Sequence, residues 1–213
     1  MCTRHEISVC LLGHSYIRGL RDFMNRNYHY YNLRLFTHLF DTFCRAQGGL
    51  TIPRLIHERS DLYNFAYTQP DIIYLQIGGN DISTWDSSPV RVASDMISFA
   101  NYLYYGLHVR IVIIGELLHR DSARVGILYN CKVVLTNVAI KQLISSDNNN
   151  NIIFWRHRGF WEDLSFLSND RVHLNHGGIL KYFKSVRSAV LHVRHSIDNN
   201  IPWKIAKTPC SYM

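Results

Sequence analysis

Short, largely apolar runs that alternate with longer segments of helical periodicity most constrain the fold of this chain. The runs are rich in Ile, Val and Leu, as parallel strands buried on both faces are. We predict strands at residues 7–12, 33–36, 72–77, 109–114 and 152–155. Strands that alternate with helices predict an α/β fold, a three-layer α/β/α sandwich with a central parallel sheet.

The segments between these runs carry the marks of helices. In the clearest one, residues 89–105, apolar side chains recur at helical spacing. Ser88 is a natural N-cap, Pro89 suits the first helical position, and Gly106 can close the end. Further helices are predicted at residues 16–25, 53–65, 129–144 and 177–195.

Length and composition fit one globular domain. The chain has 213 residues, of which 47% are apolar and 18% charged, and it is too apolar for a disordered protein. We assign residues 1–198 to the domain and residues 199–213 to a C-terminal tail. No stretch approaches the roughly 18 consecutive apolar residues that a membrane span needs. The first apolar run is too short for a secretory signal, which favours an intracellular, cytoplasmic location.

The reactive and charged residues indicate no metal and no cofactor. The five cysteines include no C-x-x-C pair, and the twelve histidines lack acidic or cysteine partners at ligand spacing. The net charge of +7 permits attraction to nucleic acid, but the basic residues are scattered. Four basic residues fall on one side of the last predicted helix: Lys181, Lys184, Arg187 and Arg194. The simpler interpretation is a solvated face, and the alternative is a phosphate-binding surface.

Small and polar residues follow the predicted strands. In open parallel sheets, sites form beyond the carboxyl ends of the strands. The residues at those positions are Gly13-His14-Ser15, Gly48-Gly49, Gly78-Gly79-Asn80-Asp81, and the loop 169–175 before the last helix. We therefore expect functional residues among them.

In these four blocks, and in the same order, the sequence resembles the SGNH (GDSL-like) hydrolases. The blocks are the strand-Gly-x-Ser start, the glycine block, the Gly-x-Asn-Asp block and Asp170-Arg171-Val172-His173. Each block alone is a common turn or capped helix start, but together they span residues 13 to 173 on fitting elements. The resemblance implies a flavodoxin-like SGNH hydrolase fold.

The resemblance also implies a catalytic triad and an oxyanion hole. Ser15 would be the nucleophile, His173 its base, and Asp170 the group that orients the imidazole. The backbone N–H groups of Ser15 and Gly49 and the side-chain amide of Asn80 would bind the oxyanion. A serine hydroxyl needs such a base to lose its proton, and a titratable imidazole suits that role.

One position departs from the family pattern. His14 stands where the family usually has Asp, which raises the alternative that His14 competes with His173 as the base. Aromatic residues near the blocks have two interpretations, as the lining of an acyl pocket or as core. These residues are Trp85, Phe160 and Trp161.

The expected function is that of a serine esterase without metal or organic cofactor, acting on short-chain acyl or acetyl esters of a small-molecule substrate. The alternative is a nucleic-acid-associated module that keeps the fold with weak or no turnover. The Gly-His-Ser start followed by Arg18 is similar to SGNH-type domains of invertebrate genomes, some linked to mobile elements. The sequence does not choose the acyl donor or the oligomeric state.

Overall fold

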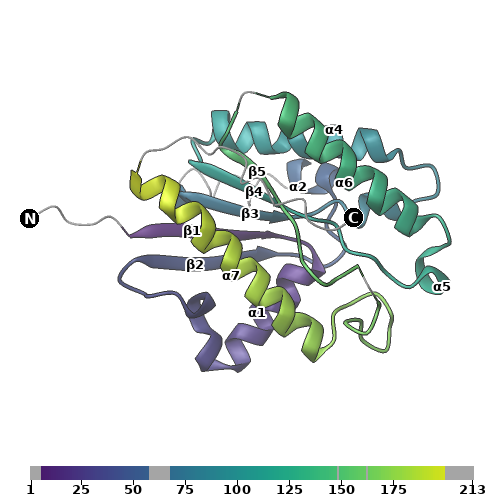
Figure 1. The fold of residues 1–213 in the computed structure, drawn as a ribbon, viewed down its shortest axis with the longest axis horizontal. Helices are drawn as coiled ribbons and strands as arrows, with labels where there is room; N and C mark the ends of the chain where they lie inside the picture. The colour runs from purple at the N-terminus through teal and green to yellow at the C-terminus, as the bar shows by residue number, and fades with distance from the viewer. Residues whose placement is uncertain (1–5, 58–67, 148, 162, 200–213) are drawn as a thin grey trace, which may run out of the picture.

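The computed structural model describes residues 6–57, 68–147, 149–161 and 163–199, with the side chains of residues 195–199 left out of the description. Five strands form one sheet in the order β2-β1-β3-β4-β5, and all neighbouring pairs are parallel (Figure 1). The strands are β1 (Ile7–Gly13), β2 (Phe40–Ala46), β3 (Ile72–Gln76), β4 (Ile111–Gly115) and β5 (Ile152–Trp155). This order is the flavodoxin-like one, whose chain reverses direction of winding between β1 and β3.

Helices cover both faces of the sheet. Figure 1 shows α1 and α7 together on one side and α4 and α6 on the other. The helices are α1 (Ser15–Arg26), α2 (Ile52–His57), α4 (Pro89–Asn101), α5 (Ser122–Val125), α6 (Tyr129–Ser146) and α7 (His176–Asn199). The predicted three-layer α/β/α sandwich is confirmed.

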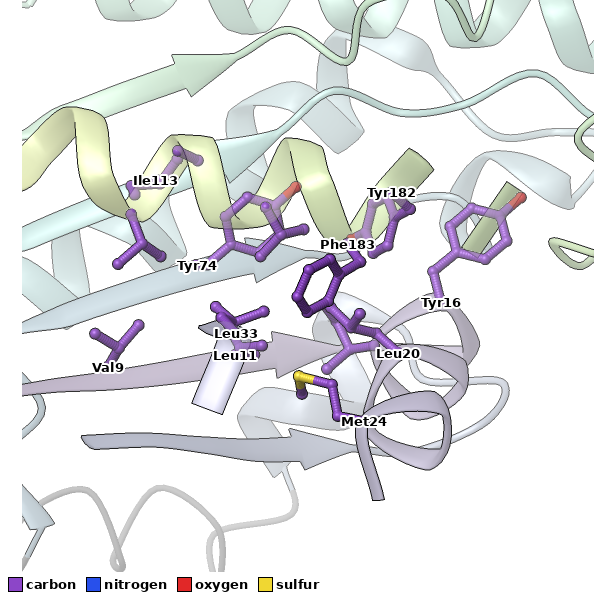
Figure 2. Close-up of a cluster of buried hydrophobic side chains, with 14 of the residues drawn as sticks. Val9, Leu11, Tyr16, Leu20, Met24, Leu33, Tyr74, Ile113, Tyr182 and Phe183 are labelled. Atoms are coloured by element: carbon purple, nitrogen blue, oxygen red, sulfur yellow. The ribbon is translucent and has the colours of Figure 1, made fainter. Parts of the chain in front are cut away.

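Alternate residues of each central strand build the two cores. On β1, Val9 and Leu11 pack with α1 and α7, whereas Cys10 and Leu12 pack with α2, α4 and α6. β3 and β4 divide in the same way, because successive side chains of a strand point to opposite faces. Figure 2 shows the first core, where Leu11 of the sheet lies among Leu20 of α1 and other buried side chains. Both faces of the central strands are therefore buried, which explains their continuous apolar sequence.

The predicted strand at residues 33–36 is wrong. Leu33 lies near the end of a short 3-10 segment, η1 (Tyr28–Arg34), with a positive φ of 53° and a fully buried side chain. The second strand begins later, at Phe40. The Asn32 side chain connects the two segments, because its Nδ2 donates to the Phe40 carbonyl at 2.8 Å and its Oδ1 accepts from Thr42 N–H at 2.9 Å.

Other boundaries shift slightly. The predicted helix at 89–105 begins at Pro89 with Ser88 as its cap, but it ends at Asn101 and continues as the π-helical turn η3 (Tyr102–Gly106). The predicted helix at 53–65 is α2 up to His57, and its remainder lies outside the described residues, as does the tail beyond Asn199. A second 3-10 turn, η2 (Asp81–Ser83), follows β3.

Candidate active site

The nucleophile candidate lies at the first residue of α1, directly beyond the end of β1. Gly13 is paired with Gln76 of β3, and a Cβ at position 13 would overlap the Gln76 backbone carbonyl. The His14 N–H donates to the same carbonyl at 3.1 Å. The chain can pass this close to β3 only with glycine at position 13, and it delivers Ser15, 8% exposed, to the carboxyl edge of the sheet.

His14 is the N-cap of α1. Its Nδ1 accepts a hydrogen bond from Tyr16 N–H at 3.4 Å, and the two rings lie edge to face with centroids 5.0 Å apart. Burial, aided by the charges of Arg120 and His173, lowers the pKa of His14 to about 3. A neutral, 1% exposed imidazole with Nδ1 engaged is poorly suited to serve as a base. An imidazole nitrogen can thus cap α1 at a position where the SGNH hydrolases that the sequence resembles usually have an aspartate.

Asp170 and His173 form a pair in the loop before α7. His173 Nδ1 lies 2.6 Å from Asp170 Oδ2. Asp170 Oδ1 accepts from the N–H groups of Val172 and His173, each at 2.9 Å, and from the Ser168 hydroxyl at 2.8 Å. Partial desolvation pushes the pKa of Asp170 upward, but these hydrogen bonds outweigh it and hold the pKa well below its usual range. The carboxylate therefore stays ionised beside the imidazole, and both side chains remain half exposed to solvent.

The loop that carries this pair is attached to the start of α1. The Tyr16 hydroxyl donates to the Val172 carbonyl at 2.9 Å, across 156 residues of sequence. A second attachment joins the loop to the β4–α5 connection, since Asp121 N–H donates to the Arg171 carbonyl and the two side chains pair at 3.3 Å. The residues next to Ser15 and His173 are thus in contact. Among the described residues, no hydrogen bond joins the Ser15 hydroxyl to His173.

Asn80 and Gly49 lie in two connected loops. Asn80 Nδ2 donates to the Leu50 carbonyl at 2.9 Å, and Asp81 Oδ1 accepts from Ile52 N–H at 2.9 Å, which fixes the glycine loop against the end of β3. Gly49 is exposed and has a φ of 71°, a value that favours glycine. An amide nitrogen carries two hydrogens, so the Leu50 carbonyl leaves one N–H of Asn80 for a further acceptor.

A buried cation in this region was missed from the sequence. Arg120, 4% exposed, follows β4 and donates from Nη1 to the Ser83 hydroxyl at 3.3 Å and from Nη2 to Asn80 Oδ1 at 3.4 Å. Its guanidinium lies over the rings of Tyr16 at 5.8 Å and Tyr129 at 5.0 Å. The only sequence signal was its place after a strand, and nothing in the pattern indicated that it would be buried.

A second missed feature is a polar network behind the site. His157 Nε2 lies 2.8 Å from the Tyr74 hydroxyl, and its Nδ1 lies 2.8 Å from the Ser185 hydroxyl. The Tyr182 hydroxyl donates to Gln76 Oε1 at 3.0 Å. All except Ser185 are fully buried. Burial lowers the pKa of His157 to about 3, so it is neutral. This network joins β3 to α7 and holds Gln76 at the end of β3, the residue that Gly13 packs against.

Phe160, Trp161 and Trp85, which could be either pocket lining or core, differ in how far they are buried. Phe160 is fully buried in the core with α1 and α7, so it does not line a pocket. Trp161 is half buried, and its Nε1 donates to Glu116 Oε2 at 2.9 Å. Trp85 is 87% exposed, in a loop whose carbonyl oxygens accept from Lys132 Nζ of α6. Of the three, only Trp85 has a freely exposed ring.

Two of the basic residues of α7 contact other groups of the protein. Lys181 Nζ donates to the Gly159 carbonyl and lies over the Phe160 ring, and the Arg194 guanidinium lies 5.3 Å from the Phe40 ring.

The described residues include no cluster of three or more His, Cys, Asp or Glu side chains placed to hold a metal ion. None of the described helices has the length and apolar character required to cross a membrane.

Comparison with known proteins gives matches in structure alone. No protein-family model and no curated protein matches the sequence. A GDSL-like lipase from Bacteroides thetaiotaomicron matches with a TM-score of 0.63 and 17% identity over 87% of this chain and 88% of that one. A carbohydrate esterase of family 3 from Talaromyces cellulolyticus matches with a TM-score of 0.65 and 14% identity over 89% and 99%.

A lipase/acylhydrolase from Enterococcus faecalis matches with a TM-score of 0.63 and 13% identity, covering 93% of this chain and 99% of that one. At identities this low the similarity supports only a common fold, and that fold extends over nearly the full length of each protein. The sheet order points to the same architecture. The chain therefore has the fold of the SGNH (GDSL-like) hydrolase superfamily, as its four sequence blocks predicted.

Proposed function

We propose that this protein is a serine esterase that hydrolyses carboxylic esters through an acyl-enzyme on Ser15. The observation that carries the proposal is the 2.6 Å Asp170–His173 pair, in a loop attached by the Tyr16 hydroxyl to the first turn of the helix that begins at Ser15. An ionised carboxylate that accepts from His173 Nδ1 leaves the lone pair of Nε2 to act as the base.

The reaction then proceeds in two halves. The Ser15 hydroxyl oxygen attacks the acyl carbonyl carbon while His173 Nε2 takes its proton, which gives a tetrahedral oxyanion. Collapse expels the alkoxide, which takes the proton from His173 and leaves as the alcohol, and the acyl group remains on Ser15. Water then loses a proton to His173 and attacks the acyl-enzyme, and the second collapse returns that proton to Ser15 and releases the acid.

The oxyanion would accept hydrogen bonds from the N–H groups of Ser15 and Gly49 and from the second N–H of Asn80. Loss of one such donor typically lowers kcat by about 10²–10³-fold. The contact between Asn80 Nδ2 and the Leu50 carbonyl supports this assignment, because it holds the amide beside the glycine loop that carries the other donor.

An acetyl or other short acyl group is the proposed substrate moiety. Similar structures include an acetyl esterase solved with an acetate ion and an acetyl-xylooligosaccharide esterase from Geobacillus, at 13% and 14% identity. The nucleic-acid alternative rests on the net charge of +7 and on the similarity of the Gly-His-Ser start and Arg18 to SGNH-type domains linked to mobile elements. Part of the basic side of α7 contacts the protein itself. No specific contact favours that alternative.

The test is hydrolysis of p-nitrophenyl acetate together with labelling by a fluorophosphonate probe. Ser15→Ala should abolish both while its circular dichroism spectrum stays that of the wild type. Ser188→Ala is the matched control, because Ser188 is exposed on α7 and its hydroxyl only donates to the Lys184 carbonyl. Equal turnover by wild type and Ser15→Ala would show that the proposed function is wrong.

A further inference from the structure

We propose that Arg120 is a positioning residue of this esterase, one that orients the Asn80 amide and holds a positive charge behind it. The inference rests on the proposed function and adds to it a residue outside the four sequence blocks. Arg120 would act through Asn80 and would not touch the substrate.

The contacts of Asn80 fix which way its amide faces. Arg120 Nη2 donates to Asn80 Oδ1 at 3.4 Å, and Asn80 Nδ2 donates to the Leu50 carbonyl at 2.9 Å. A rotation of the amide by half a turn would oppose its NH₂ group to the guanidinium and its oxygen to the Leu50 carbonyl. Arg120 therefore keeps the N–H groups on the side of the glycine loop, where the oxyanion would form.

The guanidinium also strengthens the donor. A cation on the amide oxygen polarises the amide, and hydrogen bonds in a chain reinforce one another in a buried setting. The developing oxyanion would thus meet an N–H backed by a full positive charge. This preorganised arrangement needs no movement of the protein during the reaction.

Arg120 is buried without direct contact to a carboxylate of the described residues, so its hydrogen bonds to Asn80 and Ser83 define its position. Its side chain is 4% exposed, and no carboxylate in the described ranges lies within ion-pair distance of it. Its Nε has no hydrogen-bond partner there either. Burial opposes the charge of Arg120, but Tyr129, Tyr16 and the charge of Asp170 outweigh that effect and raise its pKa. The groups in direct contact with its guanidinium are the Ser83 hydroxyl, the Asn80 amide and the rings of Tyr16 and Tyr129, and all of them are neutral.

Its location fits an action on the site. A Cβ built on Gly79 would lie 3.1 Å from Arg120 Nη2 and 3.3 Å from His14 Nε2. The guanidinium therefore packs against the turn that presents Asn80, beside the N-cap of the helix that presents Ser15. It therefore lies close to the segments that carry two of the three proposed oxyanion donors, Ser15 and Asn80.

A double-mutant cycle tests the inference. Arg120→Met removes the charge and the hydrogen bonds but keeps an apolar chain between the two tyrosine rings. We expect it to lower kcat for p-nitrophenyl acetate about 10–100-fold with little change in KM, a part of the typical loss for one oxyanion donor. In the Asn80→Ala background the same change should lower kcat less than about 3-fold, because contacting residues that act as a unit are not additive.

Two further measurements separate this role from a structural one. Arg120→Lys keeps the charge and should recover part of the kcat lost in Arg120→Met, and thermal unfolding by circular dichroism reports whether each variant folds. The side-chain ¹⁵NH₂ signals of Asn80 should shift in Arg120→Lys and in Arg120→Met. An equal loss of kcat in both backgrounds, or unchanged Asn80 signals, would overturn the inference.

The two proposals fail in different ways. A wild-type protein without Ser15-dependent hydrolysis would contradict the proposed function, and the catalytic role of Arg120 with it. An active wild type whose cycle is additive would contradict the role of Arg120 alone. An active wild type with the predicted coupling between Arg120 and Asn80 would support both.

Discussion

His157 is a buried imidazole that the fold keeps neutral, and replacing it should flatten the response of stability to acid. Its ring nitrogens contact the Tyr74 and Ser185 hydroxyls, each at 2.8 Å, and burial lowers the pKa of His157 from 6.5 to about 3. Between these two values the unfolded chain binds a proton at this residue and the native chain does not.

The magnitude follows from linkage. One extra proton on the unfolded chain lowers the free energy of unfolding by about 1.4 kcal/mol for each pH unit of acidification. The contribution is complete above the unfolded pKa of 6.5 and is lost as the pH falls toward the folded value of about 3. Burial raises the pKa of Glu116, which acts in the opposite direction between its ordinary and raised values. The effect of His157 must therefore be measured as a difference between variants.

The assay is urea-induced unfolding of wild type and His157→Gln at about pH 7, 6 and 5, followed by circular dichroism. Near pH 7 the variant should be less stable by about 1–3 kcal/mol, because the buried Tyr74 hydroxyl loses a partner. That difference should shrink by about 1.4 kcal/mol per pH unit below 6.5. His38→Gln, a change of an exposed histidine, is the control for surface substitution. Parallel stability curves for wild type and His157→Gln would refute the reasoning.

Three further outcomes are expected. Asp170→Asn should lower kcat for p-nitrophenyl acetate by about 10²–10⁴-fold, because the half-exposed imidazole loses the acceptor that fixes its tautomer. The upper value is typical of a buried triad. A loss of less than about 10-fold in steady-state kinetics would count against that role. Gly13→Ala should lower the free energy of unfolding by about 1–3 kcal/mol, since its Cβ overlaps the Gln76 carbonyl, and an unchanged urea midpoint would contradict the contact. Gly49→Ala should lower the free energy of unfolding by about 1–2 kcal/mol and so lower Tm by about 2–8 °C. The cause is backbone strain at a φ of 71°, since no atom lies within 4 Å of the added methyl group. A Tm equal to that of the wild type would show that the loop relaxes without strain.

Four of the five strands were predicted, and three of them, β1, β3 and β4, are buried on both faces. The fourth, β5, lies at an edge of the sheet and was recognised from its short apolar run although most of it is half buried. The residues of β1, β3 and β4 alternate between two apolar cores, so these strands are apolar at nearly every position, with Ser8 and Gln76 as polar exceptions. β2 lies at the edge of the sheet, and beyond Phe40 its residues are half buried or exposed. Its polar positions, such as Asp41 and Arg45, conceal it, and the apolar Leu33 nearby was assigned to a strand although it fills the core from a turn.

Some residues of the candidate site could be predicted from the sequence and others could not. Asp170 and His173 lie three residues apart in one turn, so the sequence alone places them within reach, and the structure has them in contact. Arg120 and the network around His157 were not predicted, because burial of a polar side chain depends on neighbours distant in sequence. Arg120 contacts Asn80 and Ser83, about 40 residues away, and His157 contacts Tyr74, 83 residues away. No local pattern marks such partners.

The hydrogen bond from Tyr16 to the Val172 carbonyl has a consequence for a chain that is still being synthesised. Chains grow from the N-terminus at roughly 5–20 residues per second, and this contact spans 156 residues. The ribosome would therefore complete β1 and α1 many seconds before the partner carbonyl exists. A nascent chain would carry its serine for that whole interval without the imidazole. Premature termination in the loop after β5 would therefore yield all five strands of the sheet and no catalyst.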